Sequence, residues 1–193
     1  MPILGIWASS TRQGQGPAIT GSYDALATYT VPSGGVSSIE FAGIPTGGQY
    51  THLQIRGIYR SNRSATLDPL MARFNSNAST SVYTQHAIYG NGSSVVATTN
   101  PGEAGILQYA GSTANSSSNV FGGFVMDILD YASTTKNKTL RSLGGYDNNG
   151  DGFIALNSGA YLSTSAIDTI RLYPFGGTMI EQNSQFALYG IRG

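Results

Sequence analysis

The segment YTHLQIRGIY, residues 50–59, carries the pattern that decides the fold class. Leu53 and Ile55 point to one side of an extended chain and Gln54 and Arg56 to the other, because successive side chains of a β-strand alternate. Apolar and polar residues that alternate in this way are typical of a strand with one buried face. The segment therefore predicts a core strand of a β-sheet.

The same kind of pattern recurs along the chain between turn-forming residues. In 23–31 the odd-numbered residues are predicted to share one face, and Asn91-Gly92 is a hairpin signal because both residues tolerate a positive φ. Further strands are expected at 37–41, 70–75, 82–89, 105–110, 121–131, 138–144, 152–157, 167–173 and 186–191. No segment has helical periodicity beyond one or two turns. We therefore predict an all-β chain, a single antiparallel β-sandwich of jelly-roll-like type.

The first 22 residues are predicted to form an extended N-terminal arm, followed by the sandwich domain at 23–193. An apolar cluster opens the arm, and Gly and Pro residues between positions 14 and 21 then interrupt any regular element. The cluster consists of Ile3, Leu4, Ile6 and Trp7. We expect it to bind a partner, and the alternative is that it folds back on its own domain as an edge strand.

Composition excludes several classes of function. The 193 residues suit one domain, and ten Lys and Arg balance ten Asp and Glu. A neutral chain lacks the basic surplus that nucleic acids or anionic membranes require of a partner. The absence of cysteine excludes disulfides, thiolate metal sites and cysteine nucleophiles. The N-terminus lacks the pattern of a signal peptide and no apolar run could span a membrane, so we expect a soluble protein made in a cytoplasm.

Residues that could carry catalysis are few and scattered. His52 and His86 are isolated, and neither has a second ligand at metal-binding spacing. Asp127 and Asp130 are three positions apart, which on a strand directs them to opposite faces, so they should not act as paired carboxylates. Common nucleophile, nucleotide and zinc motifs do not occur. The sequence predicts a protein that is not an enzyme, with no cofactor and no metal.

Two further motifs can be interpreted either as functional sites or as ordinary structural features. Asp147-Asn-Asn-Gly-Asp-Gly152 matches the opening of a calcium-binding loop, but Ser158 occupies the position of the required Glu and strands flank the loop, so we expect a hairpin turn. The arginines of residues 56–73, with Tyr59 between them, could suggest an RNA surface. A solvated face or ion pairing fits the neutral chain better. These arginines are Arg56, Arg60, Arg63 and Arg73.

Several segments of the sequence resemble segments of the virion structural proteins of tailed phages, especially phages of aquatic bacteria. The segments are SIEFAGIPTGGQYTHLQIRGIYR at 38–60, NVFGGFVMDILDYA at 119–132, KTLRSLGGYDNNGDG at 138–152 and FALYGIRG at 186–193. The resemblance extends over nearly the whole chain. It implies a protein that acts as a building part of the phage particle.

Within such a particle, we expect this chain to be a capsid decoration (cement) protein on the outer surface of the capsid. Its partners would be the major capsid protein and neighbouring copies of itself, with which we expect it to form a homotrimer. A tail, neck or fibre-base protein is the first alternative. A carbohydrate-binding module is the second, because the 12 tyrosines could supply stacking platforms for sugars.

Overall fold

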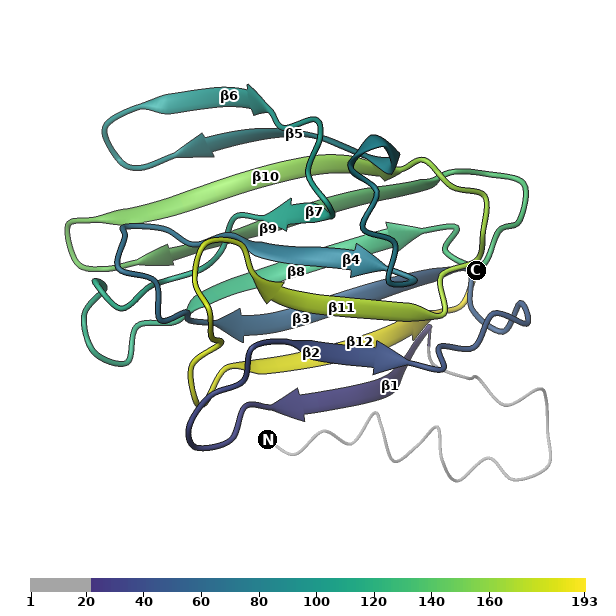
Figure 1. Cartoon of the computed structure of the whole chain (residues 1–193), viewed down its shortest axis with the longest axis horizontal. Helices are drawn as coiled ribbons and strands as arrows, with labels where there is room; N and C mark the ends of the chain where they lie inside the picture. The colour runs from purple at the N-terminus through teal and green to yellow at the C-terminus, as the bar shows by residue number, and fades with distance from the viewer. Residues whose placement is uncertain (1–21) are drawn as a thin grey trace, which may run out of the picture.

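The computed structural model describes residues 22–193, which form twelve strands in two antiparallel sheets. The predicted β-sandwich is thereby confirmed (Figure 1). Residues 1–21 of the predicted arm, with the cluster Ile3, Leu4, Ile6 and Trp7, lie outside the described residues. The strands are β1 (Tyr23–Thr30), β2 (Ile39–Ala42), β3 (His52–Tyr59), β4 (Leu70–Phe74), β5 (Tyr83–Gly90), β6 (Val95–Thr99), β7 (Ile106–Gln108), β8 (Gly122–Leu129), β9 (Lys138–Asp147), β10 (Gly152–Tyr161), β11 (Thr169–Pro174) and β12 (Gln185–Ile191).

The strand order is that of a jelly roll with one sheet extended. The larger sheet has the order β1-β12-β3-β8-β9-β10-β5-β6, and the smaller has β2-β11-β4-β7. If β5, β6, β9 and β10 are left out, eight strands remain. Counted in chain order, the first of these (β1) pairs with the eighth (β12) and the second (β2) with the seventh (β11), as in the two Greek keys of a jelly roll. The hairpins β5–β6 and β9–β10 are insertions that widen the larger sheet.

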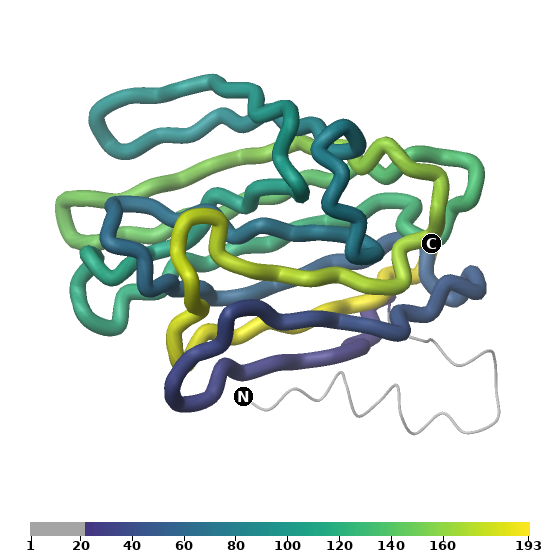
Figure 2. Tube along the Cα trace, in the orientation of Figure 1, coloured from purple at the N-terminus to yellow at the C-terminus, as the bar shows by residue number. Residues whose placement is uncertain are grey.

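The core lies between the sheets, where the smaller sheet covers only part of the larger one (Figure 1). Tyr59, Phe74 and Met126 are completely buried there, together with Leu53 and Ile55 of the strand predicted from the sequence. The β5–β6 hairpin extends past β7 at the top of Figure 2. The inserted strands thus extend the larger sheet past the edge of the smaller sheet.

A β-bulge corrects the predicted alternation in β1. Ala25 pairs with Tyr189, but the register then shifts so that Ala27 pairs with Leu188. Paired residues point to the same side of a sheet, so Ala27 lies on the core side whereas Ala25 does not. Leu26 and Ala27 are both packed against the core. The single face predicted for the odd-numbered residues of 23–31 is therefore wrong, because strict alternation does not allow for the extra residue.

The structure also adds a strand that the sequence pattern did not indicate. Strand β6 follows the Asn91-Gly92 turn and forms the exposed edge of the larger sheet. Its residues, VVATT, have neither a charged face nor a strongly apolar one. The hairpin signal at Asn91-Gly92 was correct, and the second strand of that hairpin was the part that was missed.

Two buried charged side chains hold loops to the sandwich. Asp68 is fully buried, and its carboxylate accepts hydrogen bonds from the backbone N–H groups of Gly176 (2.8 Å) and Gly177 (3.0 Å). Lys138 is also fully buried, and its Nζ donates to the carbonyl oxygens of Lys136 (3.0 Å) and Ser163 (3.3 Å). A buried charge is tolerated only when it is paired or hydrogen-bonded, which both are. No helix of the described residues is long and apolar enough to cross a membrane.

Candidate interaction surface

The outer face of the larger sheet carries an unusual set of exposed aliphatic side chains. Val95 is 73% exposed and Ile154 62%, and the others are between 40% and 55% exposed. We call this set the apolar outer patch. It comprises Ile58, Ile88, Val95, Leu143, Ile154 and Leu156. Antiparallel sheets usually present polar residues on the face that is not packed on the core, so this face departs from the rule.

The strand register brings these side chains together in two neighbouring rows that cross the sheet. The first, the glycine row, runs Val95, Gly90, Ile154, Gly145, Gly123, Ile58. The second, the aliphatic row, runs Ala97, Ile88, Leu156, Leu143, Val125, Arg56. Rows two residues apart on the same face are about 7 Å from each other. The patch is therefore continuous from β6 to β3.

The glycine row leaves a hollow in this face. Gly123 and Gly145 have no side chains there, and Val125, Leu143 and Ile154 line its sides. A Cβ atom built on Gly123 would have no atom within 4 Å, so the space above it is open. The aliphatic row beside it rises as a ridge, because Leu156, Leu143 and Val125 project from the same face. The patch thus combines a trough and a parallel ridge.

A polar network borders the patch. Asp127 accepts hydrogen bonds from Gln54 Nε2 (2.7 Å) and Arg141 Nε (2.9 Å). The Arg56 guanidinium lies 5.4 Å from the ring centroid of Tyr189 and 5.6 Å from that of Tyr23. These cation–π contacts draw the charge toward β12 and β1, away from the patch. An apolar centre with a polar rim is the usual anatomy of a protein–protein interface.

The carboxylates and histidines predicted to be non-catalytic do not converge. Asp127 pairs with Arg141 on the outer face, whereas Asp130 follows the end of β8 and pairs with Lys136 (2.9 Å). The Lys136 ammonium lowers the pKa of Asp130. His52 Nδ1 accepts a hydrogen bond from the backbone N–H of Asp130 (2.9 Å). His86 lies on β5, and β8, β9 and β10 separate it from the strand of His52.

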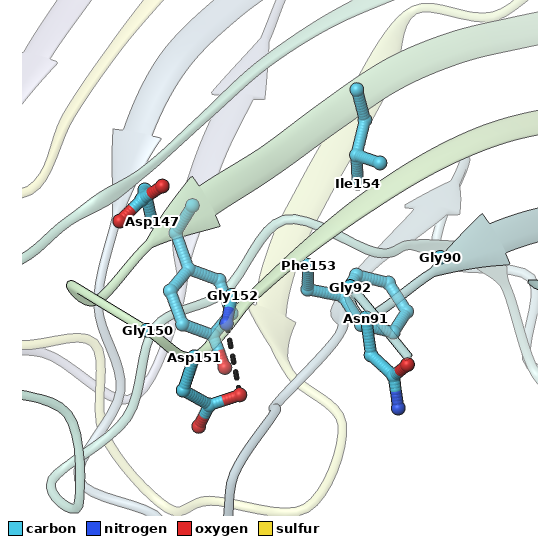
Figure 3. A pocket seen from close by; sticks show the side chains of 10 residues that line it. Gly90, Asn91, Gly92, Asp147, Gly150, Asp151, Gly152, Phe153 and Ile154 are labelled. Atoms are coloured by element: carbon cyan, nitrogen blue, oxygen red, sulfur yellow. Dashed lines mark hydrogen bonds between the residues drawn. The ribbon is translucent and has the colours of Figure 1, made fainter. Parts of the chain in front are cut away.

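The Asp147–Gly152 loop forms the hairpin turn between β9 and β10. Asn149 and Gly150 both have a positive φ, 55° and 106°, as a two-residue type I′ turn requires. The Asp147 carboxylate accepts a hydrogen bond from Asn149 N, and that of Asp151 accepts one from Gly152 N. Figure 3 shows the two carboxylates pointing away from each other. Within residues 22–193, no three His, Asp or Glu side chains are grouped so that they could hold a metal ion.

The four arginines do not form one basic surface. Arg56 is on the outer face of the larger sheet, while Arg60 donates to backbone carbonyls of the loop at 116–120. Arg63 pairs with Asp68, and Arg73 lies over the ring of Tyr173. Ion pairing and local hydrogen bonds therefore account for them, in line with the interpretation favoured from the sequence.

Most tyrosines are not available as platforms for sugars. Only Tyr23 (49%) and Tyr29 (38%) are exposed, and both belong to β1. Burial raises the pKa of Tyr83 to about 12 and also that of Tyr109. Tyr109 packs in a stack with Tyr89 and Phe153, whose ring centroids lie 4.9–6.1 Å apart. The aromatic residues thus serve mainly to fill the sandwich.

The apolar outer patch itself was not predicted from the sequence. A signal was present in Phe153-Ile-Ala-Leu156, where apolar residues occupy both faces of one strand. Such a run indicates a strand that is covered on both sides. No model of a protein family, no curated protein and no solved structure matches the chain. The apolar outer patch can bind an apolar surface.

Proposed function

We propose that this protein is a bacteriophage virion structural protein, a capsid decoration protein that binds the outer shell and bridges major capsid subunits. The observation that carries the proposal is the apolar outer patch, a broad contact surface through which a small neutral sandwich can join neighbouring copies of itself in a shell. Exposed apolar areas of this size on soluble proteins usually mark interaction sites. The phage assignment rests on the sequence phrases that resemble tailed-phage virion proteins.

A decoration protein works through contact area and requires no catalysis. Each contact in a repeating shell is modest, but many equivalent contacts add up because a protein held at one point rebinds readily at the next. A chain without net charge avoids long-range repulsion between the neighbouring copies that such a lattice brings together. We therefore expect no enzymatic activity, and we expect the partners to be the major capsid protein and other copies of this chain.

The copy number in purified virions tests this proposal. Particles of a phage that encodes the chain would be purified, and the protein would be quantified against the major capsid protein by mass spectrometry. Hundreds of copies per particle are expected for a shell protein, whereas a handful would indicate the tail, neck or fibre base. Virions that lack the polypeptide would refute a structural role altogether.

Attachment to the shell is the second test. Purified full-length protein would be mixed with capsid shells of the same phage and sedimented, and the bound fraction measured. Replacing Ile3, Leu4, Ile6 and Trp7 with Ser is expected to weaken attachment if the arm is an anchor. Leu162→Asp removes an exposed aliphatic side chain outside both the arm and the patch and serves as the control. Undiminished attachment of the arm variant would exclude the anchoring role.

A further inference from the structure

We propose that two copies of this chain pair through their apolar outer patches, face to face, about a two-fold axis that runs along the rows. The contact goes beyond the proposed function, and it replaces the homotrimer expected from the resemblance with a two-fold pair. It assigns an occupant to the apolar outer patch, where six exposed aliphatic side chains lie together on one face of the larger sheet.

The self-complementary shape of the patch supports a second copy as the occupant. The glycine row and the aliphatic row run parallel and side by side. A two-fold rotation about an axis between them places the aliphatic row of each copy over the glycine row of the other, so that ridge meets trough at β8 and β9, while Leu156 meets Ile154 on β10. Leu143 then lies over Gly145 of the other copy, and Val125 over Gly123, because each pair shares a strand. Stacked sheets are about 10 Å apart, which suits aliphatic side chains that meet backbone.

The area of the patch approaches the area that a stable dimer buries. The six aliphatic residues expose on average about half of their surface, or roughly 500 Å² in total. Val125, Ala97 and the polar rim around them bring the area toward the roughly 800 Å² per partner of a standard interface. The largest apolar patch of a typical monomer is about 300–600 Å², and the aliphatic atoms alone reach the upper part of this range.

Charge does not oppose the pairing. Arg56 is the one charged residue in the two rows, and it lies at the end of the aliphatic row. Its guanidinium stacks with Tyr189 and Tyr23 toward the β1 edge. The centre of the interface would therefore contain no charge that must lose its water.

The N-terminal arm is a poorer occupant. The patch extends over six strands, from β3 to β6, which corresponds to about 24 Å across the sheet. The four apolar residues of the arm could cover only part of this width. The chain also enters the sheet at β1, and β12 separates β1 from the nearest strand of the patch. An arm segment would contact either the trough or the ridge, whereas a second copy contacts both rows of the patch.

The test is the mass of the full-length protein in solution, measured by light scattering after size-exclusion chromatography and by sedimentation equilibrium. The expected mass is twice the 20.2 kDa of the chain. Gly123→Arg fills the trough from a Cβ position that has no atom of its own chain within 4 Å, and Leu143→Asp places a charge on the ridge. Each is expected to raise the dissociation constant of the dimer at least about 30-fold, the effect of losing a central contact.

Matched controls separate the interface from general effects of the substitutions. Gly47→Arg introduces the same side chain at an exposed loop glycine whose Cβ position is equally open. Leu162→Asp changes an aliphatic residue of similar exposure, which lies beyond the far end of β10. Both controls are expected to remain dimers. Far-UV circular dichroism and thermal melting establish that each variant is folded, and Gly123→Arg provides the answer if Leu143→Asp does not fold.

Each other outcome counts against the proposal. A monomeric wild-type protein, or a trimer, would overturn the two-fold pairing. So would a dimer that persists in both folded patch variants. If replacing the four apolar arm residues with Ser also abolishes the dimer, the arm is part of the occupant and the patch does not pair with itself. These results are independent of virion copy number, so the dimer and the proposed function can fail separately.

Discussion

Two consecutive glycines on β8 provide a sharp test of how the sandwich is packed. Gly122 faces the core side, where a Cβ atom would lie far inside van der Waals contact with the carbonyl oxygen of Ala110. Gly123 faces outward, and a Cβ atom there would have nothing within 4 Å. Replacing each with Ala adds the same methyl group to neighbouring positions of one strand. Only the surroundings of the two positions differ.

The structure sets the magnitude of each effect. For Gly122→Ala, the segment around Ala110 must move away, which disrupts the hydrogen bonds from Ser112 Oγ to Val120 O and from Ser61 N to Ser112 O. Two lost bonds at about 1 kcal/mol each, with about 1–3 kcal/mol of overpacking, amount to about 3–5 kcal/mol of destabilisation. For Gly123→Ala, the loss of backbone freedom in the unfolded chain is expected to stabilise the protein by about 0.5–1 kcal/mol.

Thermal and urea unfolding of the two variants and the wild type measure the difference. A domain of this size is expected to lose about 10 °C in Tm with Gly122→Ala and to gain about 2 °C with Gly123→Ala. Measurements at protein concentrations where the chain is monomeric keep self-association out of the comparison. Equal stability of Gly122→Ala and the wild type would refute the close packing of the 110–112 segment on β8.

Further predictions concern single polar groups. Gln108 is fully buried and its amide has no hydrogen-bond partner in the protein, so Gln108→Met is expected to stabilise the fold by about 1–2 kcal/mol; a lower urea midpoint would contradict this. Hydrogen bonds from Arg192 and Tyr50 hold the pKa of Asp24 below its usual value. That carboxylate should therefore stabilise the protein above about pH 4 and lose its contribution as the pH falls further, so Asp24→Asn should lower Tm at neutral pH but not in strong acid. The pKa of Tyr83 is raised to about 12, so stability should fall as the pH rises from about 10, where the unfolded chain ionises first. The difference in phenolate absorbance between the wild type and Tyr83→Phe should appear together with unfolding, and a difference well before unfolding would count against burial of Tyr83.

Local patterns in the sequence were sufficient to predict most strands. Leu53 and Ile55 are fully buried, as the alternation of residues 50–59 indicates. The turn chemistry of Asn149-Gly150 follows from two residues that tolerate a positive φ, whereas in the Asn91-Gly92 turn only Gly92 adopts one. Strand β6 was missed because a short edge strand buries little, and so carries little pattern. The bulge in β1 was missed because it depends on the partner strand β12.

By itself, the sequence determined the fold class, most of the turns and the neutral net charge, because alternation, turn residues and composition are read from the chain without knowledge of its partners in the fold. Only the tertiary structure decided that two inserted hairpins widen one sheet of a jelly roll, and that Ile88, Leu143 and Leu156 meet on its open face. These residues come from three separate strands, and each reads as an ordinary core position in its own segment. Which face of a strand is covered depends on how far the opposite sheet extends, and that is a property of the assembled layers.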